Sequence, residues 1–430
     1  MKRTVLEKLK KWKDSKKRKP LILWGARQVG KTWVLQEFGK ECFTNTVYIS
    51  FYNNKRMASI FEEDYDTDRI INALEIETHS VINSDDTLII FDEIQGAPKV
   101  LESLKYFCEE KREYVICAAG SLLGVALHEG VSFPVGKVDE IRMHPMSFRE
   151  FLWGMDEEKL ADYIYTGDFE RVNEFHDRYN ELLKQYYVTG GMPEVVSTYI
   201  GSKDFAEVRS VQNSILHQYE GDFGKHIKAE ELPRIRMVWG SLPAQLSKEN
   251  KKFFFGHIKK GARSKDFESA IEWLKDAGLI HIVNKVSKPA MPLKSYADRS
   301  AFKIYMNDVG LLGALSELDP ESVILGNDIY TEFKGALTEQ YVVQQMLAET
   351  DFSLYYYATD KAAYEVDLLI QSGRNVIPIE IKAEENTRAK SLKYYYDKFE
   401  PTYVLRASTL NYVDQGWLVN YPLWAVEKMK

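Results

Sequence analysis

One glycine-rich segment, residues 25–32 (GARQVGKT), constrains the fold of this chain more than any other feature. It follows the short apolar run 21–24 (LILW) and precedes residues 33–38 (WVLQEF), which have helical character. A strand, a glycine-rich loop and a helix in this order predict a phosphate-binding loop. The two glycines let successive backbone N–H groups surround a phosphate, and the positive end of the helix faces the same oxygens. The sequence therefore predicts an α/β P-loop core around a parallel sheet.

The same segment predicts which side chains meet a nucleotide. The expected nucleotide-binding residues are Gly25, Ala26, Arg27, Gln28, Val29, Gly30, Lys31 and Thr32. Lys31 is expected to reach the β- and γ-phosphates, and the Thr32 hydroxyl is expected to bind a magnesium ion. ATP and Mg²⁺ are the cofactors that follow from this pattern.

A second segment, residues 87–93 (TLIIFDE), is an apolar run that ends in two acids. A buried strand with this ending, about sixty residues after a P-loop, predicts a Walker B motif. Asp92 is expected to hold magnesium, directly or through water, and Glu93 to orient and deprotonate the attacking water. Taken alone, an acidic pair after a strand also fits an ordinary helix cap.

A third apolar run, residues 114–119 (YVICAA), ends in Gly120 and Ser121. If it lies beside the other strands, Ser121 is placed near the γ-phosphate and acts as a sensor of the nucleotide state. The alternative is that Ser121 caps the next helix. The sequence leaves both readings open.

Charge, cysteine content and hydropathy restrict the class of protein. A formal net charge of -7 argues against a nucleic-acid surface over the whole molecule, although a local basic surface is compatible with it. The cysteines, Cys42, Cys108 and Cys117, form no CxxC pair, which favours a reducing compartment. No run of 18 apolar residues and no signal-peptide pattern occurs, so we expect a cytoplasmic protein without membrane contact.

A chain of 430 residues predicts two or three domains. We expect a basic N-terminal helix at 1–18, the P-loop core at 19–150, a helical lid at 151–225, a winged-helix region at 226–324 and an α/β domain at 325–430. The winged-helix region contains a basic stretch, namely Lys248, Lys251, Lys252, Lys259, Lys260, Arg263 and Lys265 against Glu249. The helix after it carries Glu268, Glu272 and Asp276, which repel a DNA backbone. Contact with nucleic acid and contact with a protein therefore both remain open.

Near the C-terminus, three acids and a lysine fall in a pattern that suggests chemistry. Residues 365–370 and 376–382 read as two strands joined by a hairpin turn, and they carry Asp367, Glu380 and Lys382. Because side chains alternate along a strand, Glu380 and Lys382 project from the same face. This is the spacing of a PD-(D/E)XK nuclease site, in which Asp367 and Glu380 hold a divalent metal, Lys382 stabilises charge and Glu339 completes the metal shell. The alternative is a solvated hairpin with an ion pair.

Five motifs in order resemble a known group of proteins. They are GARQVGKT, LIIFDEIQ, the strand ending in GS, residues 144–152 (HPMSFREFL) and residues 190–194 (GGMPE). Together they look like the prokaryotic AAA-type ATPases with a C-terminal domain of unknown function. The resemblance implies an AAA-like core, a helical and winged-helix middle and a C-terminal restriction-endonuclease-like fold.

The chain departs from that group at one position. It reads Gly136-Lys137 where such proteins usually show Gly-Arg. Lysine lacks the bidentate fork of arginine, so the role of an arginine finger is in doubt there, and Arg142, Arg149 and Arg263 are the alternatives.

Two functions fit these predictions. In the first, an ATPase controls metal-dependent cleavage of nucleic acid. Contact with DNA is then expected through the winged-helix and nuclease-like regions. In the second, ATP binding is a regulatory switch, and those regions only bind a protein or nucleic-acid partner. A homo-oligomer is compatible with either.

Overall fold

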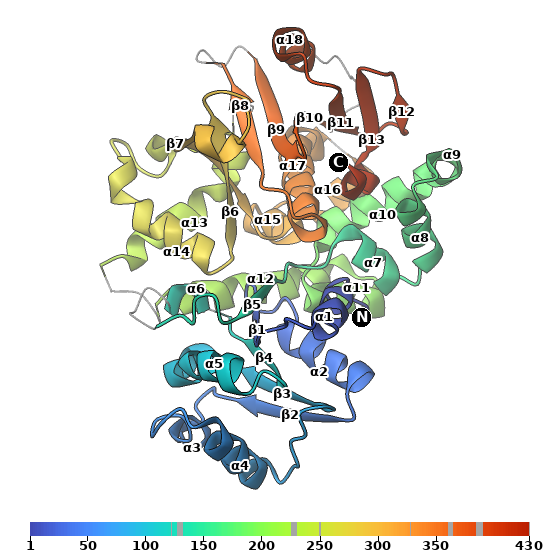
Figure 1. Cartoon of the computed structure of the whole chain (residues 1–430). Coiled ribbons are helices and arrows are strands. Elements are labelled where there is room, and N and C mark those ends of the chain that lie inside the picture. The colour runs from blue at the N-terminus through green and yellow to red at the C-terminus, as the bar shows by residue number, and fades with distance from the viewer. Residues whose placement is uncertain are drawn as a thin grey trace. The chain divides into compact units, whose positions relative to one another are not determined.

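The computed structural model describes residues 1–121, 123–126, 132–224, 230–248, 251–326, 328–359, 364–383 and 390–429 (Figure 1). Glu249, part of the basic stretch, lies outside these residues. The internal contacts divide the chain into two units. One unit comprises residues 2–144 with 276–278, and the other comprises residue 1 with 145–275 and 279–430. Among the described residues, no helix combines the length and the apolar character needed to cross a membrane.

The unit formed by residues 2–144 contains a five-stranded sheet in the order β2-β3-β4-β1-β5. All four pairings in it are parallel, as the P-loop pattern predicts. Its strands are β1 (Leu21–Trp24), β2 (Asn45–Ser50), β3 (Thr87–Asp92), β4 (Val115–Ala119) and β5 (Asp139–Arg142). Its helices are α1 (Val5–Lys13), α2 (Lys31–Cys42), α3 (Lys55–Ser59), α4 (Thr67–Thr78), the 3-10 turn η1 (Ile94–Gly96), α5 (Pro98–Glu110) and α6 (Leu123–Ala126).

The central strands β3 and β4 are buried on both faces, which explains why they are continuous apolar runs. Every residue of β3 and of β4 is buried. Alternate residues such as Ile89 and Ile116 join Ile70 of α4 and Leu104 of α5 in one core. Helix α2 also packs on β2, β3 and β4 and buries residues such as Val34. Strands that meet helices in this way lack the polar alternation of a half-exposed sheet.

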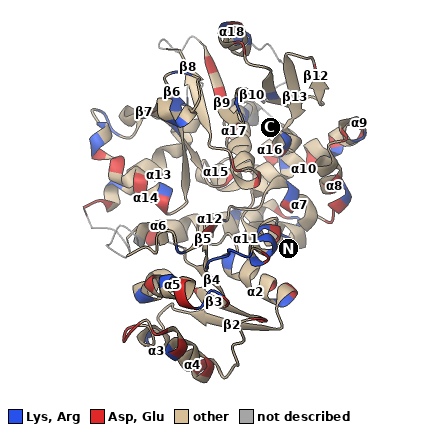
Figure 2. Ribbon diagram, viewed as in Figure 1, with Lys and Arg blue, Asp and Glu red and all other residues tan. Residues whose placement is uncertain are grey.

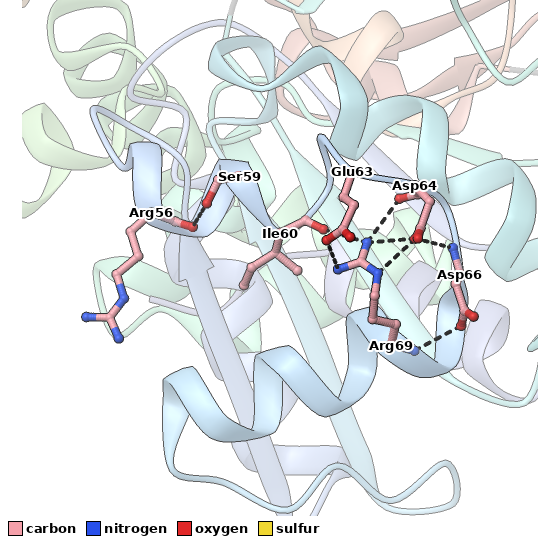
Figure 3. Close-up of polar contacts among 7 residues, drawn as sticks. All are labelled: Arg56, Ser59, Ile60, Glu63, Asp64, Asp66 and Arg69. Atoms are coloured by element: carbon pink, nitrogen blue, oxygen red, sulfur yellow. Dashed lines mark hydrogen bonds and ion pairs between the residues drawn. The ribbon is translucent and has the colours of Figure 1, made fainter.

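The connection from α3 to α4 is fixed by Arg69 (Figure 3). The Arg69 guanidinium donates to Asp64 Oδ1 at 2.8 Å and to the backbone carbonyl of Ile60 at 2.9 Å. Asp66 caps α4 by accepting from the backbone N–H of Arg69 at 3.0 Å. One arginine therefore binds the loop to the helix that follows it, a structural role that explains this charged cluster.

The second unit begins with helices and ends with a mixed sheet. Its helices before the sheet are α7 (Phe148–Gly154), α8 (Glu158–Thr166), α9 (Phe169–Val172), α10 (His176–Thr189), α11 (Pro193–Ser202), α12 (Phe205–Phe223), α13 (Leu232–Leu246) and α14 (Glu268–Asp276), with 3-10 turns at Asn173–Phe175, Phe255–His257 and Ser264–Asp266. The later helices are α15 (Val309–Leu315), α16 (Pro320–Leu325), α17 (Asp328–Glu349) and α18 (Lys390–Phe399), with 3-10 turns at Leu293–Tyr296 and Leu423–Lys428.

The sheet of this unit has eight strands in the order β12-β13-β11-β10-β9-β8-β6-β7. They are β6 (Ile280–Val286), β7 (Ala297–Met306), β8 (Tyr355–Ala358), β9 (Glu365–Ser372), β10 (Asn375–Lys382), β11 (Val404–Ser408), β12 (Val413–Asp414) and β13 (Leu418–Pro422). The hairpin expected at residues 365–382 is present, because β9 and β10 pair antiparallel.

This sheet crosses the expected boundary between residues 324 and 325. Strand β6 pairs in parallel with β8, with Asn284 opposite Tyr355, so the β6–β7 hairpin extends the C-terminal sheet. The five-part division of the chain stays a prediction. In the structure, strands from the expected winged-helix region (226–324) and from the expected C-terminal domain (325–430) belong to one sheet.

Two of the sequence motifs contact each other in the second unit. The backbone N–H of Met146 donates to the carbonyl of Gly191 at 2.6 Å. Gly190 has φ +69°, and a Cβ there would lie 2.1 Å from Asp308 Oδ1. Asp308 in turn accepts from the backbone N–H of Gly191 at 2.6 Å. Both glycines therefore have a packing reason: Gly190 closely approaches the buried Asp308 carboxylate, and Gly191 closely approaches the backbone of Met146.

Candidate functional site

The carboxyl ends of β1, β3 and β4 carry the residues that the sequence assigns to the nucleotide. Because these strands are parallel and β4 lies between β1 and β3, their ends meet at one edge of the sheet. The glycine-rich loop follows β1, Glu93 follows β3, and Ser121 lies two residues after β4. One edge of the sheet therefore gathers all three motifs.

The backbone of the glycine-rich loop requires both of its glycines. Gly25 has φ +153°, and a Cβ there would lie 2.4 Å from the carbonyl oxygen of Met143. Gly30 has φ +92° and is the N-cap of α2. Between them, Gln28 also has a positive φ, of 64°. A larger residue at position 25 would displace the backbone of residue 143, so the loop conformation depends on this glycine.

Lys31, the first residue of α2, is buried and turned toward the loop. Its ammonium donates to the carbonyls of Gly25 at 2.9 Å and Ala26 at 2.7 Å. Burial lowers the pKa of Lys31 to about 8, against the opposing effect of Glu93 and Asp92. Within the described residues the hydrogen-bond partners of Lys31 are carbonyls, and a buried cation held in this way gains from an anion placed beside it.

Thr32 and Asp92 are in direct contact. The Thr32 hydroxyl donates to Asp92 Oδ2 at 2.6 Å, and the hydroxyl of Tyr48, on β2, donates to the same oxygen at 3.0 Å. The backbone N–H of Glu93 donates to Asp92 Oδ1 at 2.9 Å. Burial, together with the Asp92 carboxylate, raises the pKa of Tyr48 to about 12. The Asp92 carboxylate is thereby fixed at both oxygens.

Glu93 has a left-handed backbone, with φ 54°, and its carboxylate is held by two side chains. The Ser121 hydroxyl lies 3.1 Å from Glu93 Oε1 and 3.2 Å from Oε2, and the Gln95 amide donates to Oε2. Ser121 therefore touches Glu93, an arrangement that neither reading of the sequence included.

Tyr48 and Gln95 were missed by the sequence reasoning. Gln95 lies two residues after Glu93, and this proximity to the motif was an available signal. Tyr48 lies in a strand before the Walker B motif, and only the pairing of β2 with β3 brings it near Asp92. The residues around Tyr48 in the sequence carry no signal of that role.

The residues of this edge fit a magnesium nucleotide by their chemistry. The loop between β1 and α2 carries the two positive-φ glycines that let successive backbone N–H groups surround a phosphate. The Thr32 hydroxyl and the Asp92 carboxylate, which are hydrogen-bonded to each other, offer oxygen ligands of the kind that Mg²⁺ prefers. Lys31 supplies a cation for phosphate.

The sequence of this region matches a known family. Residues 17–152 match the family model of an AAA domain. These residues form an AAA-type P-loop ATPase domain. The AAA domain thus spans the whole parallel sheet and all three of its motifs. Two further matches concern the rest of the chain: residues 180–322 match a domain of unknown function, DUF8612, and residues 334–425 match another, DUF4143.

Solved structures resemble this chain at low identity. A Walker-type ATPase of Pyrococcus abyssi is 17% identical, with a TM-score of 0.44, over 72% of this chain and 94% of that chain. The Orc1 protein of Aeropyrum pernix, in complex with DNA, is 15% identical, with a TM-score of 0.27, over 73% and 90%. AMPPCP-bound DnaA of Aquifex aeolicus is 13% identical, with a TM-score of 0.28, over 63% and 86%. No curated protein matches.

Three of the four predicted C-terminal residues, Asp367, Glu380 and Lys382, lie on the hairpin of β9 and β10. Lys382 Nζ lies 2.9 Å from Glu380 Oε1, so these two side chains share a face as expected. Glu380 Oε2 is buried and has no hydrogen-bond partner within the described part of the chain. Asp367 Oδ2 accepts from the backbone N–H of Ile381 at 2.7 Å. The two carboxylates are therefore carried by neighbouring strands, and Glu380 keeps one oxygen for a cation.

Glu339, on α17, has a different environment. Its side chain is only 4% exposed and contacts two ammonium groups, Lys251 and Lys303, as well as the Tyr305 hydroxyl. Lys303 Nζ is 3.1 Å from Glu339 Oε1 and 2.7 Å from Glu365 Oε1. Burial opposes the ionisation of Glu339, but the two lysines outweigh it and lower its pKa.

This environment corrects the expectation that Glu339 completes a metal shell with Asp367 and Glu380. In the part of the chain that the structure describes, no group of three or more His, Cys, Asp and Glu residues is placed to hold a metal ion. The reason is electrostatic: both Glu339 oxygens are already bonded to donors, and a divalent ion there would face two ammonium groups. The residues present thus fit a cation at Asp367 and Glu380, and do not fit one at Glu339.

Two of the four candidates for a group on the transferred phosphate, Lys137 and Arg149, have other contacts. Lys137 lies 2.7 Å from Glu109 Oε1 in an ion pair. The guanidinium of Arg149 lies over the rings of Trp153, at 4.6 Å, and Tyr165, at 4.3 Å. Arg142, at the end of β5, and Arg263 are both exposed.

Proposed function

We propose that the AAA domain binds ATP with Mg²⁺ and hydrolyses it. The observation that carries this proposal is the 2.6 Å contact between Thr32 and Asp92, with Lys31 in the adjacent loop. An oxygen pair for a metal and a buried cation for phosphate lie at one edge of the sheet, as ATP hydrolysis requires. Cytoplasmic location is part of the same proposal.

Each side chain has a distinct task in this proposal. Lys31 leaves the loop carbonyls and donates to the β- and γ-phosphates, while the backbone N–H groups of residues 25–32 surround the phosphates. Thr32 and Asp92 hold Mg²⁺, which neutralises charge on the phosphate oxygens when it is bound. Glu93 orients the attacking water and accepts its proton.

Ser121 acts through Glu93 in this scheme. Because its hydroxyl donates to the Glu93 carboxylate, it positions the general base. A γ-phosphate offers the same hydroxyl a competing acceptor, and this exchange would let Ser121 report the nucleotide state. The sensor role is thereby supported over helix capping. The group that stabilises the transferred phosphate remains one of Lys137, Arg142, Arg149 and Arg263.

The C-terminal unit is proposed to contain a restriction-endonuclease-like core. From α17 the elements follow the order helix, three strands, helix, strand, and β8, β9, β10 and β11 are neighbours in the sheet. The strands β8, β9 and β10 pair antiparallel, and β11 is parallel to β10. With Asp367, Glu380 and Lys382 on β9 and β10, this arrangement supports metal-dependent cleavage of nucleic acid under the control of the AAA domain.

Contact with nucleic acid is supported by a charge asymmetry. Residues 248–303 carry 13 Lys and Arg against six Asp and Glu, a net charge of +7 in a chain of -7. Lys252, Lys259, Lys260, Arg263 and Lys265 are exposed there, and so is the ring of Phe254. Glu268 and Glu272 of α14 are exposed, and Figure 2 shows acidic residues on that helix, so the loop before it is the better phosphate-binding surface. We assign this contact to the proposed winged-helix region.

A second function, a regulatory switch without cleavage, is favoured by the lysines around Glu339. A carboxylate set with internal counter-ions suits binding better than metal-dependent chemistry.

The test uses the full-length chain with plasmid, linear duplex and single strands, Mg²⁺ or Mn²⁺, with and without ATP. Cutting that is lost in Asp367→Ala and altered in Lys31→Ala supports the controlled nuclease. Cutting that persists in Asp367→Ala would remove it. If no metal supports cutting while nucleic acid still binds in an ATP-dependent way, the switch is the better account.

A further inference from the structure

The segment that contains α1 is attached to the AAA domain beside its glycine-rich loop. Helix α1 lies against α2 (Figure 1) and buries its apolar side chains, among them Leu9. The Lys13 ammonium, at the end of α1, donates to the carbonyl of Cys42, at the end of α2, at 2.8 Å. Arg3, just before α1, contacts Val29, just before α2. The two helices therefore run in the same direction, and the beginning of α1 lies at the nucleotide-binding loop.

Arg3 has a buried side chain that joins two backbone carbonyls. The residue is only 5% exposed. Its Nη1 donates to the carbonyl of Val29 at 2.7 Å, and its Nη2 donates to the carbonyl of His144 at 2.7 Å. Val29 belongs to the glycine-rich loop, and His144 follows β5, the strand that pairs with β1. Because the guanidinium is planar and its donors have fixed directions, it holds the loop at a defined place relative to the end of β5.

The end of β5 also supports the beginning of the loop. The backbone N–H of Met143 donates to the carbonyl of Trp24 at 2.7 Å, which continues the pairing of β5 with β1. The carbonyl oxygen of Met143 approaches Gly25 so closely that a Cβ on this glycine would lie 2.4 Å from it. Residues 143 and 144 therefore contact the loop at two places, directly at Gly25 and through Arg3 at Val29.

We propose that Arg3 is a positioning residue for phosphate binding, which fixes and polarises the peptide between Val29 and Gly30 so that its N–H faces the phosphates of ATP. The inference rests on the ATP binding proposed above. A trans peptide is planar, and its C=O and N–H point in opposite directions. A guanidinium on the carbonyl of Val29 therefore directs the N–H of Gly30 away from itself. The charged donor also makes that N–H a stronger donor, because hydrogen bonds in a chain polarise one another.

This role affects binding of the nucleotide more than the chemical step. The peptide between Val29 and Gly30 belongs to the loop that surrounds the phosphates, whereas the proposed general base, Glu93, follows β3. A misplaced loop should weaken contacts to the phosphates by a similar factor in the ground state and in the transition state. Loss of such uniform binding raises KM and leaves kcat unchanged.

The test measures the affinity of the full-length chain for ATP and for inorganic tripolyphosphate by calorimetry, and kcat and KM for ATP hydrolysis. Arg3→Met is expected to bind both ligands about tenfold more weakly, roughly the effect of one charge-assisted hydrogen bond. Its KM for ATP should rise by a similar factor, while kcat stays within about twofold of the native value. Arg3→Lys keeps a cation that can donate to the same carbonyls, so it should recover most of the affinity.

Two control variants on α1 separate the guanidinium of Arg3 from the docking of the helix. Lys11→Met removes an exposed cation of the same helix and should bind ATP as the native chain does. Leu9→Ala removes a fully buried side chain, so it should lower the melting temperature while the affinity for ATP stays the same. If Leu9→Ala loses as much affinity as Arg3→Met, docking of α1 and not the guanidinium carries the effect, and the proposal is wrong.

Failure of this inference and failure of the proposed ATP binding give different results. If Arg3→Met binds ATP as tightly as the native chain while Lys31→Ala does not, the role of Arg3 is overturned and ATP binding stands. A native chain that binds neither ATP nor tripolyphosphate overturns both. A lowered kcat with an unchanged KM in Arg3→Met also contradicts the role in phosphate binding. Thermal unfolding shows whether each variant folds, and Arg3→Gln, with the same expected loss, replaces Arg3→Met if that variant does not.

Discussion

The hydroxyl of Thr32 lies 2.6 Å from Asp92 Oδ2, so the first turn of α2 and the last residue of β3 meet at one carboxylate oxygen. The two residues are 60 positions apart in the sequence, and the parallel sheet brings them together. The nucleotide site is built around this contact. Lys31 precedes Thr32, the backbone N–H of Glu93 donates to Asp92, and Ser121 is bonded to the Glu93 carboxylate.

Replacing Lys31 with alanine is expected to weaken ATP binding by at least about 100-fold, since two charge-assisted phosphate contacts are lost. Binding of a fluorescent ATP analogue measures the change. Lys40→Ala, on the same helix but 72% exposed, is the matched control and should bind as the native chain does. Similar affinities in the two variants would contradict the assignment of Lys31.

Glu93→Gln is expected to bind ATP normally and to hydrolyse it about 10² to 10⁴ times more slowly, because an amide accepts no proton from water. Phosphate release under saturating ATP gives the rate. Glu113→Gln, an exposed glutamate of the same domain, should keep the native rate. Equal turnover in Glu93→Gln and the native chain would refute the role of a general base.

The substitution Ser121→Ala distinguishes a role of Ser121 in positioning Glu93 from a role in binding ATP. Loss of the hydrogen bond to Glu93 is expected to lower the turnover number about fivefold, the effect of one typical hydrogen bond, while the affinity for ATP stays the same. A loss of affinity with an unchanged turnover number would instead assign the hydroxyl to ground-state binding of the nucleotide.

The lowered pKa of Lys31 predicts proton uptake on ATP binding. In the free protein burial lowers this pKa to about 8, and a polyphosphate beside the ammonium raises it again. At about pH 8.5 to 9, binding should therefore take up close to one proton, falling toward none below about pH 7. Calorimetry in buffers of different ionisation enthalpy measures this uptake. Lys31→Met should show none at any pH.

The lowered pKa of Lys31 also determines how burial of this residue contributes to the free energy of unfolding as the pH changes. Because the pKa of Lys31 in the folded chain lies below its ordinary value of 10.5, burial of charged Lys31 costs free energy below about pH 8. That cost decreases as the pH rises from about 8 toward 10.5.

Gly190→Ala is expected to lower the free energy of unfolding by more than about 1 kcal/mol. The position has φ +69°, and the added Cβ would meet Asp308 Oδ1. Gly201→Ala on α11 has open space around it and should be neutral or slightly stabilising. Denaturant unfolding compares the two. Equal stabilities would mean that Asp308 moves away without cost.

The AAA core was predictable because local patterns determine it. The glycine-rich pattern of residues 25–32 predicts the backbone conformation of the loop. The apolar runs around Ile90 and Cys117 predict fully buried strands. A parallel sheet then places the ends of such strands together, so the meeting of Thr32 with Asp92 follows from the order of motifs.

The environment of Glu339 was not predictable in the same way. Its partners, Lys251 and Lys303, belong to segments that the sequence assigns to another domain. Only the pairing of β6 with β8 brings β7 near α17, and a strand pairing across about 70 residues has no local signature. From the sequence, the basic stretch around Lys251 is predicted to be a solvated surface. Composition alone does not show that Lys251 points inward.

The ladder between β6 and β8 has a practical consequence for dissecting the chain. A fragment that starts near residue 325 loses β6, leaving β8 as a bare edge with unpaired amides and carbonyls, a template for intermolecular strand addition. The same cut strips Glu339 of both ammonium partners. Such a fragment should self-associate or unfold. If it shows no cleavage, the removal of β6 explains that result, which then says nothing about the activity of the full-length chain.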